Sequence, residues 1–277
     1  MQKETLPTPG PDFLAAQALT NPAPQSQPRL PGTLIGIGVG PGDPELISLK
    51  ALKYLQSAPV VAFPAGRNYQ PGVAETIIAP WLRPEQTQVP LYFPYVQDSA
   101  QLALAWESAA KAIWPYLQVG DVVFACEGDV SFYGTFTYLA QSLLDIYPQA
   151  TVKTVPGISS PMAAAAALNI PLTMQGQRLA ILPALYTAHQ LEDAIRWAEV
   201  VVLMKVGSVY SQVWQVLKQH HLLHCSYVVE NATRGDQTIY SNLQACPTLD
   251  LSYFSILVVQ PQRSAIPAQM TDKPAHS

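Results

Sequence analysis

Charged residues are scarce in this sequence, and positive charge is not in excess. Asp, Glu, Lys and Arg make up 12% of the 277 residues, which is about half the share that is usual in soluble proteins. The formal net charge is −4, so the chain lacks the excess of positive charge that binding to nucleic acid favours. Hydrophobic residues make up 49% of the chain and predict extensive burial in a core, an apolar cleft or a subunit interface.

Cysteines and long apolar runs are also few. Cys126, Cys225 and Cys246 are far apart and form no C-x-x-C pair, which argues against a disulfide framework or a zinc ribbon and favours core positions. No apolar run approaches the ~18 residues of a membrane span, and the N-terminus lacks the features of a signal peptide. We therefore expect a cytoplasmic protein with no membrane partner. His220 and His224 have helical i, i+4 spacing, but we expect them to cap a helix end rather than bind a metal.

The chain is predicted to consist of two tails and two folded halves. Prolines at positions 7, 9, 11, 22, 24, 28 and 31 remove backbone donors and fix φ, so the N-terminal segment is predicted to be a flexible tail. Between the tails, strand-like runs alternate with helical patterns, which predicts an α/β architecture with mostly parallel sheets. The expected parts are a flexible tail (1–31), an N-terminal α/β domain (32–149), a C-terminal α/β domain (150–262) and a second flexible tail (263–277).

Several helices and strands can be placed from local signals. Asp43 and Pro44 are predicted to begin a helix that ends near Gln56, with Asp43 as its N-cap. Apolar residues recur at helical spacing from Ser99 to Leu117, and Pro115 is expected to bend or end that helix. Buried strands are predicted at Pro59–Phe63, Asp121–Cys126 and Glu199–Met204.

Glycine-rich loops follow three of the predicted strands, where open α/β sheets bind ligands. They read "GVGPGDPEL", "EGDVSFYGTF" (127–136) and "VPGISSPMAAA" (155–165), and a fourth loop, "LMKVG" (203–207), follows a strand of the second half. The first loop lacks both the G-x-G-x-x-G dinucleotide fingerprint and the Gly-Lys-Ser/Thr of a P-loop. A nicotinamide oxidoreductase is therefore not expected. The plainer alternative is that tight strand-to-helix turns simply need residues with positive φ.

The composition of the three glycine-rich loops does not suit a phosphate. Pro41 has no N–H to donate, Asp43 and Asp129 would repel a phosphate group, and no Lys or Arg lies in these loops. A ligand with adenosine and amino-acid groups and a cationic centre fits better, and S-adenosylmethionine has these features without phosphate. The residues alone make this cofactor a suggestion.

The motifs together resemble those of the tetrapyrrole methylases. The similar segments are "GVGPGDPELISLKALKYLQSAPVVAFP", "EGDVSFYGTFTYL" and "VPGISSPMAAAAALNIPL", and the resemblance extends from Gly32 to Gln260. It implies two α/β domains, a homodimer, and S-adenosylmethionine in a cleft between the domains. Two positions depart from the family pattern, because Val130 stands where proline is common and Ala232 where glycine is common. The cofactor-binding residues that the resemblance implies are Pro41, Glu127, Gly128, Asp129, Phe132, Ser159, Ser160, Met204 and Ala232.

Within this family, the "GDVSFYGTFTYL" run is most similar to the branch that methylates C20 of precorrin-2 or cobalt-factor II in cobalamin biosynthesis. In this reaction the electron-rich ring attacks the methyl group, the protein orients it, and a base or solvent removes the displaced proton. Tyr133 and Asp129 are the candidate bases. The carboxylates of a tetrapyrrole call for cations and an apolar surface, and the candidate substrate-binding residues are Arg67, Tyr92, Phe93, Lys205 and Arg234.

Other interpretations remain open. The candidate cations could be solvated surface charges, and the aromatic residues could serve ordinary core packing. A sister methylase would use the same cofactor on another tetrapyrrole carbon or on a target such as rRNA or an elongation-factor residue, although the lack of positive charge disfavours rRNA. A third possibility is a non-catalytic tetrapyrrole-binding protein with the same fold.

Overall fold

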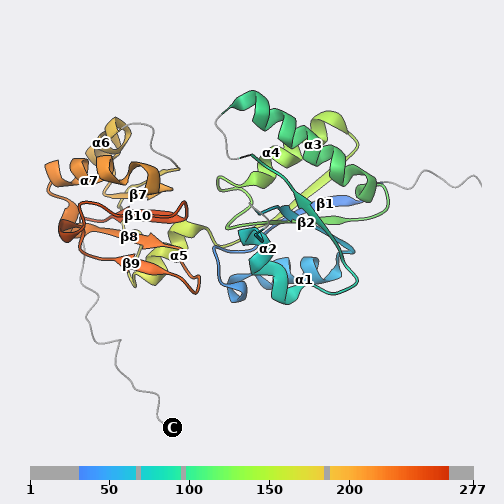
Figure 1. Cartoon of the computed structure of the whole chain (residues 1–277), viewed down its shortest axis with the longest axis horizontal. Coiled ribbons are helices and arrows are strands. Elements are labelled where there is room, and N and C mark those ends of the chain that lie inside the picture. The colour runs from blue at the N-terminus through green and yellow to red at the C-terminus, as the bar shows by residue number, and fades with distance from the viewer. Residues whose placement is uncertain (1–30, 67–69, 95–97, 184–187, 262–277) are drawn as a thin grey trace, which may run out of the picture. The chain divides into compact units, whose positions relative to one another are not determined.

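A computed structural model gives the structure of the chain (Figure 1) and describes residues 31–66, 70–94, 98–183 and 188–261. Residues 1–30 and 262–277, in which the two predicted tails fall almost entirely, lie outside the described residues, as does Arg67. The strands are β1 Thr33–Gly38, β2 Val60–Pro64, β3 Thr87–Leu91, β4 Val122–Cys126, β5 Thr151–Val155, β6 Leu179–Leu182, β7 Val200–Met204, β8 Ser226–Glu230, β9 Thr238–Tyr240 and β10 Ser255–Val259. The α-helices are α1 Leu49–Ser57, α2 Val73–Ile78, α3 Ser99–Leu117, α4 Thr135–Ile146, α5 Ser160–Ala167, α6 Ala188–Trp197 and α7 Tyr210–Gln219.

The first sheet is parallel throughout and has the strand order β3-β2-β4-β1-β5. Its central strands β1 and β4 are buried along almost their whole length, as expected for strands that are covered on both faces. The connection from β1 leads past β4 to β2, whereas the connection from β4 leads past β1 to β5. The carboxyl ends of β1 and β4 therefore form the topological switch point, where ligands bind in folds of this kind.

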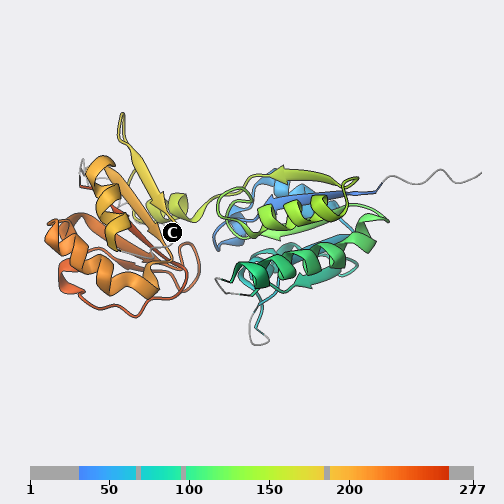
Figure 2. The same cartoon turned by 90° about the horizontal axis from the view of Figure 1, so that it is seen from above.

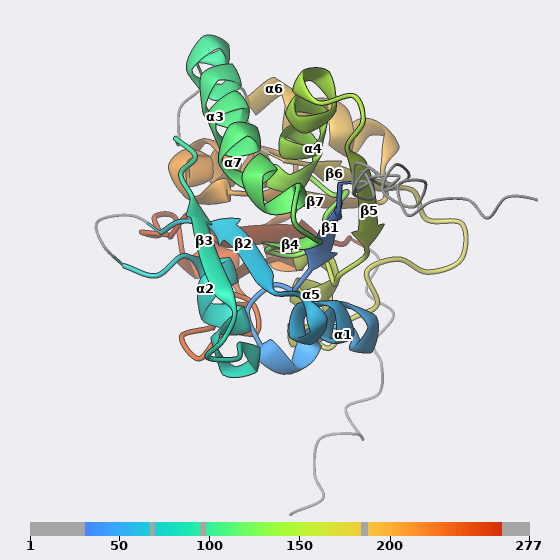
Figure 3. The same cartoon turned by 90° about the vertical axis from the view of Figure 1, so that its right-hand side faces the viewer.

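Helices cover both faces of the first sheet (Figure 3). Ala51 and Leu55 of α1 pack with residues of α2 against one face, and residues of α3 and α4 pack against the other. Trp106 of α3 stacks on Tyr138 of α4 with ring centroids 5.3 Å apart, and the two helices run side by side (Figure 2). The α/β layers predicted from the alternating sequence pattern are thus confirmed.

The second sheet has the order β6-β7-β10-β8-β9 and is mixed. Only the β6–β7 pair is parallel, while β10 is antiparallel to both of its neighbours, β7 and β8. The expectation of mostly parallel sheets is therefore correct for the first sheet and wrong for the second. The reason is that β9 and β10 enter the sheet without the intervening crossover helices that parallel pairing requires. Residues of α5 pack on one face of this sheet and residues of α6 and α7 on the other.

Local signals placed most elements, with differences at their ends. Asp43 does act as an N-cap, but of the short 3₁₀ helix Pro44–Leu46, and Ser48 then caps α1 by accepting a hydrogen bond from Ala51 N at 3.2 Å. Pro115 lies within the last turn of α3 and the helix continues to Leu117. The edge strand β3 was not predicted, because Pro90 argues against a central strand and is tolerated only at an edge.

The strand that follows the predicted boundary at residue 150 belongs, by its pairing, to the first sheet. Strand β5, Thr151–Val155, pairs with β1 and so completes the first sheet. The next strand, β6, belongs to the second sheet, so any hinge would lie between these two strands. The domain boundaries themselves stay a prediction.

The cysteines lie in or near the core without disulfides. Cys126 is buried in β4, and burial raises the pKa of its thiol to about 11, which makes it unreactive at neutral pH. Cys225 is buried in the 3₁₀ helix Leu223–Cys225 rather than in a strand, and Cys246 is half-buried. Within the described ranges, no helix combines the length and hydrophobicity needed to cross a lipid bilayer.

Candidate functional site

The loops after β1 and β4 are joined by backbone hydrogen bonds at the switch point. Gly128 N donates to Gly40 O at 2.8 Å, and Gly40 N donates to Gly128 O at 3.2 Å. Both glycines have positive φ, +86° at Gly40 and +69° at Gly128, a conformation that glycine adopts without steric cost. Pro41, predicted to lie at the cofactor, is buried directly beside this pair.

Three glycines bring the backbones of the first, second and third loops into contact. A Cβ atom on Gly38 would lie 2.5 Å from Gly157 N, and a Cβ atom on Gly157 would lie 2.3 Å from Gly128 O. Neither distance is compatible with a side chain, because carbon atoms in contact are about 3.5 Å apart. We call Gly38, Gly128 and Gly157 the glycine cradle. The sequence predicted Gly128 as a cofactor residue and placed Gly38 and Gly157 in glycine-rich loops after strands, but it predicted no site role for these two.

Asp129 connects the second loop to the third. Its Oδ1 accepts hydrogen bonds from Ser131 N at 2.8 Å and Ser131 Oγ at 2.6 Å, and its Oδ2 accepts one from Gly157 N at 2.8 Å. Burial acts to raise the pKa of this carboxyl, but the hydrogen bonds together outweigh burial and lower it. A carboxylate that is so occupied and so weakly basic suits a structural role better than that of a base.

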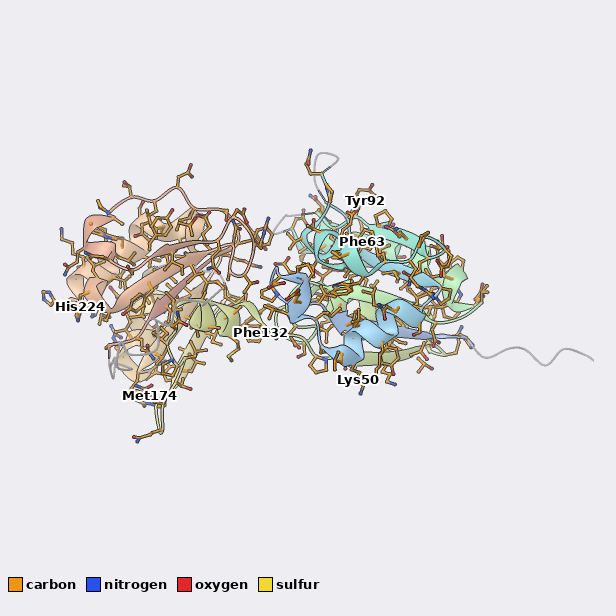
Figure 4. All side chains as sticks on the ribbon, turned by 90° about the horizontal axis from the view of Figure 1, so that it is seen from below. Lys50, Phe63, Tyr92, Phe132, Met174 and His224 are labelled. Carbon is orange, nitrogen blue, oxygen red and sulfur yellow. The ribbon has the colours of Figure 1, made fainter. Side chains whose placement is uncertain are left out.

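The remaining residues of the second loop alternate between core and surface. Val130, which stands where the family pattern has proline, is 3% exposed and packs in the core beneath α3 and α4. Phe132, labelled in Figure 4, meets the ring of Tyr133 edge-on with centroids 4.8 Å apart. Tyr133 is 53% exposed and has φ of +52°, which is unusual for a bulky residue. The candidate base Tyr133 is thus accessible to a ligand.

The third loop leads directly into α5. Ser159 is the N-cap residue of this helix, and its backbone oxygen accepts hydrogen bonds from Met162 N and Ala163 N. Its side chain makes no capping hydrogen bond. Ser159 and Ser160 are both half-buried, so their hydroxyl groups are available to a ligand next to the glycine cradle.

Two loops of the second sheet carry the other predicted residues. Lys205 follows β7 with φ of +60°, and its Nζ lies 5.0 Å from the centroid of the Tyr253 ring. Met204, the last residue of β7, is half-buried and pairs with Ile256. Ala232, in the loop after β8, is 6% exposed. It is flanked by Asn231 and Thr233, which both have positive φ and were not predicted as site residues.

The loop after β8 contacts the first glycine-rich loop. Asp43 N donates a hydrogen bond to Thr233 Oγ1 at 3.1 Å. A Cβ atom on Gly42 would lie 2.3 Å from Arg234 Cγ. The structure therefore brings Pro41, Ala232 and Arg234 into one neighbourhood, although more than 180 residues separate the first from the others. A cofactor cleft between the two halves stays a prediction.

Glu127 is the titratable group of this neighbourhood whose pKa departs most from its ordinary value. Burial raises the pKa of its carboxyl to about 7, although the positive charges of Arg234 and Lys205 act in the opposite direction. Arg234 also lies 3.4 Å (Nε) from Asp236 Oδ1, and its guanidinium carbon is 5.4 Å from the centroid of the Phe254 ring. The predicted cations Lys205 and Arg234 thus both act on a predicted cofactor residue.

The aromatic residues after β3 differ from each other. Tyr92 is 76% exposed (Figure 4). The ring of Phe93 instead lies 4.5 Å from that of Trp106 and packs beside the core, which is the packing role left open by the sequence. Both follow a strand whose carboxyl end lies at the same sheet edge as the glycine cradle. A role for either in substrate binding stays a prediction.

The histidine pair has no metal-binding surroundings. His220 is the C-cap residue of α7, and His224 lies in the 3₁₀ helix Leu223–Cys225. Over the described part of the chain, no three His, Cys, Asp or Glu side chains are grouped as metal ligands would be. The site described above consists instead of close backbone, hydroxyl groups, the two carboxyl groups of Glu127 and Asp129, and two cations.

Comparison with known proteins finds one matching family and several similar methyltransferases. The profile of the family described as Tetrapyrrole (Corrin/Porphyrin) Methylases matches residues 33–246. A precorrin-2 C(20)-methyltransferase from Sinorhizobium sp is 29% identical, with 82% of this chain and 95% of the relative aligned. A cobalt-precorrin-2 C(20)-methyltransferase from Salmonella typhimurium is 30% identical over 83% of this chain and 97% of the relative. Cobalamin biosynthesis protein CobIJ of Mycobacterium bovis is 31% identical over 82% of this chain, which spans only 46% of that protein.

Solved structures share the fold at lower identity. A cobalt precorrin-4 methyltransferase has a TM-score of 0.63 and 21% identity, covering 82% of this chain and 94% of its own. A uroporphyrin-III C-methyl transferase from Thermus thermophilus, complexed with S-adenyl homocysteine, has a TM-score of 0.59 and 21% identity over 83% of this chain and 98% of its own. At this level of identity the likeness concerns the fold alone.

Proposed function

We propose, for a chain that belongs to the tetrapyrrole (corrin/porphyrin) methylase family, that it transfers a methyl group from S-adenosylmethionine to C20 of precorrin-2 or cobalt-factor II. The observation that carries this proposal is the match to two C20-methyltransferases over nearly their whole length. The resemblance predicted from the sequence motifs is confirmed by the names of these relatives. Because one relative acts on precorrin-2 and the other on its cobalt form, both forms are retained as substrates.

The glycine cradle supports S-adenosylmethionine as the cofactor. In the cradle, backbone packs against backbone, and the three glycine-rich loops that it joins contain no Lys or Arg for a phosphate. When bound, the cofactor would supply a methyl group attached to a positively charged sulfur, and this methyl group is the one that the electron-rich ring of the substrate would take. The residues proposed to hold it are Pro41, Glu127, Gly128, Asp129, Phe132, Ser159, Ser160, Met204 and Ala232.

The side chains around the cradle are proposed to bind the substrate, to hold the loops in place and to remove the displaced proton. Lys205 and Arg234 are proposed to bind carboxylates of the tetrapyrrole and so to orient its meso carbon in line with the methyl group. Asp129 keeps the second and third loops together through its hydrogen bonds. Of the two candidate bases, Tyr133 is the more accessible. Its hydroxyl group is proposed to relay the displaced proton to solvent, accepting that proton as it donates its own to water.

We also propose a homodimer, as the family resemblance implies, and a cytoplasmic location, as expected from the sequence. Twice the chain mass of 30.1 kDa is the value that light scattering on the purified protein should return. A mass equal to one chain would contradict this part of the proposal and leave the reaction unaffected.

The test is an anaerobic incubation with S-adenosylmethionine, ¹³C-labelled at its methyl group, and precorrin-2 prepared with and without cobalt. Mass spectrometry should detect one added methyl group, and NMR should assign the label to C20. The form that turns over faster identifies the natural substrate. A label on another carbon would favour a sister methylase instead. Binding of both ligands with no transfer of label would favour a non-catalytic tetrapyrrole-binding protein.

A further inference from the structure

The loop between β8 and β9, residues 231–237, meets the first glycine-rich loop through one hydrogen bond and close packing. Asp43 N donates to Thr233 Oγ1 at 3.1 Å, and among the hydrogen bonds of the described residues this is the one that joins the two loops. A Cβ atom on Gly42 would lie 2.3 Å from Arg234 Cγ and 3.2 Å from Thr233 Oγ1. The β8–β9 loop therefore lies directly against the first loop, with no space for a side chain at Gly42.

The first loop is also held by its own half of the chain, on both sides of this contact. Gly40 exchanges two backbone hydrogen bonds with Gly128, and Pro44 O accepts a hydrogen bond from Trp81 Nε1 at 3.2 Å. These bonds fix the first loop without any help from the second sheet. What Thr233 adds is the hydrogen bond that ties the β8–β9 loop to this fixed loop.

Thr233 has a backbone conformation that threonine rarely adopts. Its φ is +67°, which is a steric outlier for a β-branched residue, whereas glycine adopts such angles without steric cost. Hydrogen bonds within the β8–β9 loop hold the turn, from Thr233 N to Gln237 Oε1 at 2.7 Å and from Arg234 N to Asn231 O at 3.0 Å. Strained backbone of this kind gathers at ligand clamps and switch regions. Here the strained residue is the one whose hydroxyl group meets the first loop, a contact that glycine could not make.

We propose that Thr233 is a positioning residue of the cofactor site. Its hydroxyl group holds the β8–β9 loop against the first loop and so sets the separation between Pro41 and Ala232, which are the chain neighbours of the contacting residues. Both Pro41 and Ala232 are buried. This inference rests on the proposed function, because it takes these two residues to hold S-adenosylmethionine. It adds to that function a residue that acts on the cofactor through others.

Loss of the hydroxyl group should affect the release of the cofactor more than its entry. One hydrogen bond shifts an equilibrium by about threefold to tenfold. Without it the two loops separate more often, and a ligand that both loops contact dissociates faster. Because changes at one binding site alter mostly the dissociation rate constant, we expect this constant to rise by about threefold to tenfold and the association rate constant to change by less than about twofold.

The experiment measures the binding of S-adenosylhomocysteine to the full-length protein and needs no turnover. Surface plasmon resonance on the immobilised protein gives both rate constants. Thr233→Val keeps the branched shape of the side chain and removes the hydroxyl group, and it should release the ligand about threefold to tenfold faster than the wild type. Thr233→Ser keeps the hydroxyl group and should release the ligand at the wild-type rate.

Thr233→Gly separates positioning from stability. Glycine adopts the positive φ without steric cost, so this variant should unfold at no lower urea concentration than Thr233→Val. It should nevertheless release S-adenosylhomocysteine as fast as Thr233→Val does, because it also lacks the hydroxyl group. A merely structural role would instead make the release rate follow the loss of stability across the three variants.

Thr76→Val is the matched control. Thr76 Oγ1 donates to Gly72 O at 3.0 Å at the start of α2, so this variant also loses one threonine hydrogen bond, but one that involves neither loop. It should release the ligand at the wild-type rate. Gly42→Ala disturbs the same contact as Thr233→Val from the other side, so the double variant should release the ligand no faster than the faster of the two single variants.

Each outcome bears on either this inference or the proposed function. Release at the wild-type rate from Thr233→Val, or equally fast release from Thr233→Ser and Thr233→Val, would overturn the role of the Thr233 hydroxyl group and leave the proposed methyl transfer intact. Faster release from Thr76→Val, or additive effects in the double variant, would also contradict it, because the loop contact would then not be the cause. A wild-type protein that does not bind S-adenosylhomocysteine would refute the proposed cofactor and this role together.

Discussion

The glycine cradle makes the substitution Gly157→Ala a stringent test of the site. The added Cβ atom would lie 2.3 Å from Gly128 O and 2.7 Å from the Cα and carbonyl carbon of Gly38. All of these atoms are backbone, so the loops must separate by about 1 Å to restore ordinary contact. Overpacking of this kind costs about 1–3 kcal/mol. Weakening of the hydrogen bond from Gly157 N to Asp129 adds about 1 kcal/mol, for a total loss of about 2–4 kcal/mol of unfolding free energy.

Two assays on the purified protein measure this effect. Urea unfolding gives the change in stability, and calorimetric titration with S-adenosylhomocysteine gives the affinity for a cofactor-like ligand, which should fall by at least about tenfold, or about 1.4 kcal/mol. Gly176→Ala is the control, because a Cβ atom there would meet no atom within 4 Å, and its stability should change by less than about 0.5 kcal/mol. If Gly157→Ala matched the control in both assays, the cradle would not be the close backbone contact described above.

Three further substitutions test other parts of the structure by urea unfolding. Asp129→Ala removes three hydrogen bonds and should lower the free energy of unfolding by about 2–4 kcal/mol at neutral pH. Because the pKa of Asp129 is lowered, this loss should shrink as the pH falls through the folded-state pKa. A loss that does not change with pH would contradict the role given to the carboxylate. Glu127→Gln should raise the free energy of unfolding by up to about 3 kcal/mol above pH 7, because the folded-state pKa of about 7 exceeds the ordinary glutamate pKa of 4.5. This gain should vanish below about pH 4.5. A variant that is less stable than the wild type at high pH would refute the raised pKa of Glu127. Tyr210→Phe leaves the carbonyl oxygen of Cys246 without its hydrogen bond of 2.8 Å and should cost about 1–2 kcal/mol, whereas an unchanged stability would mean that water replaces the hydroxyl group.

The sequence predicted the first sheet better than the second for a physical reason. In the first half, each buried strand is followed by a helix, so alternation along the chain reflects adjacency in space. In the second half, β10 is the last strand in the sequence but lies between β7 and β8. Its pattern, five buried residues in a row, is that of any central strand and carries no information about direction. Antiparallel insertion of β10 therefore could not be predicted.

The site could be predicted where a loop carries its own signal, and not where two loops meet. Gly128 and Asp129 were predicted because they belong to a recognisable motif, and the structure places them at the switch point, as expected from their position after a strand. Thr233 had no local signal, because its role is to accept a hydrogen bond from Asp43 N, a residue 190 positions away. Glu127 was predicted from its motif, but the raised pKa of its carboxyl was not. This pKa depends on burial and on two cations in loops of the other sheet.

Backbone strain is concentrated where these loops meet. Of the seven described non-glycine residues with positive φ, four follow β4, β7 and β8 at the ends that carry the site, namely Tyr133, Lys205, Asn231 and Thr233. Such conformations cost about 1–3 kcal/mol each and persist only where the surroundings enforce them. Here Lys205 N donates to Ser255 O and Asn231 N donates to Phe254 O, both at about the usual distance, so the neighbouring segment that leads into β10 holds both turns. Strand β10, whose antiparallel direction could not be predicted, thus helps to fix the positions of Lys205 and of the loop that carries Arg234. From these positions the two cations lower the pKa of Glu127.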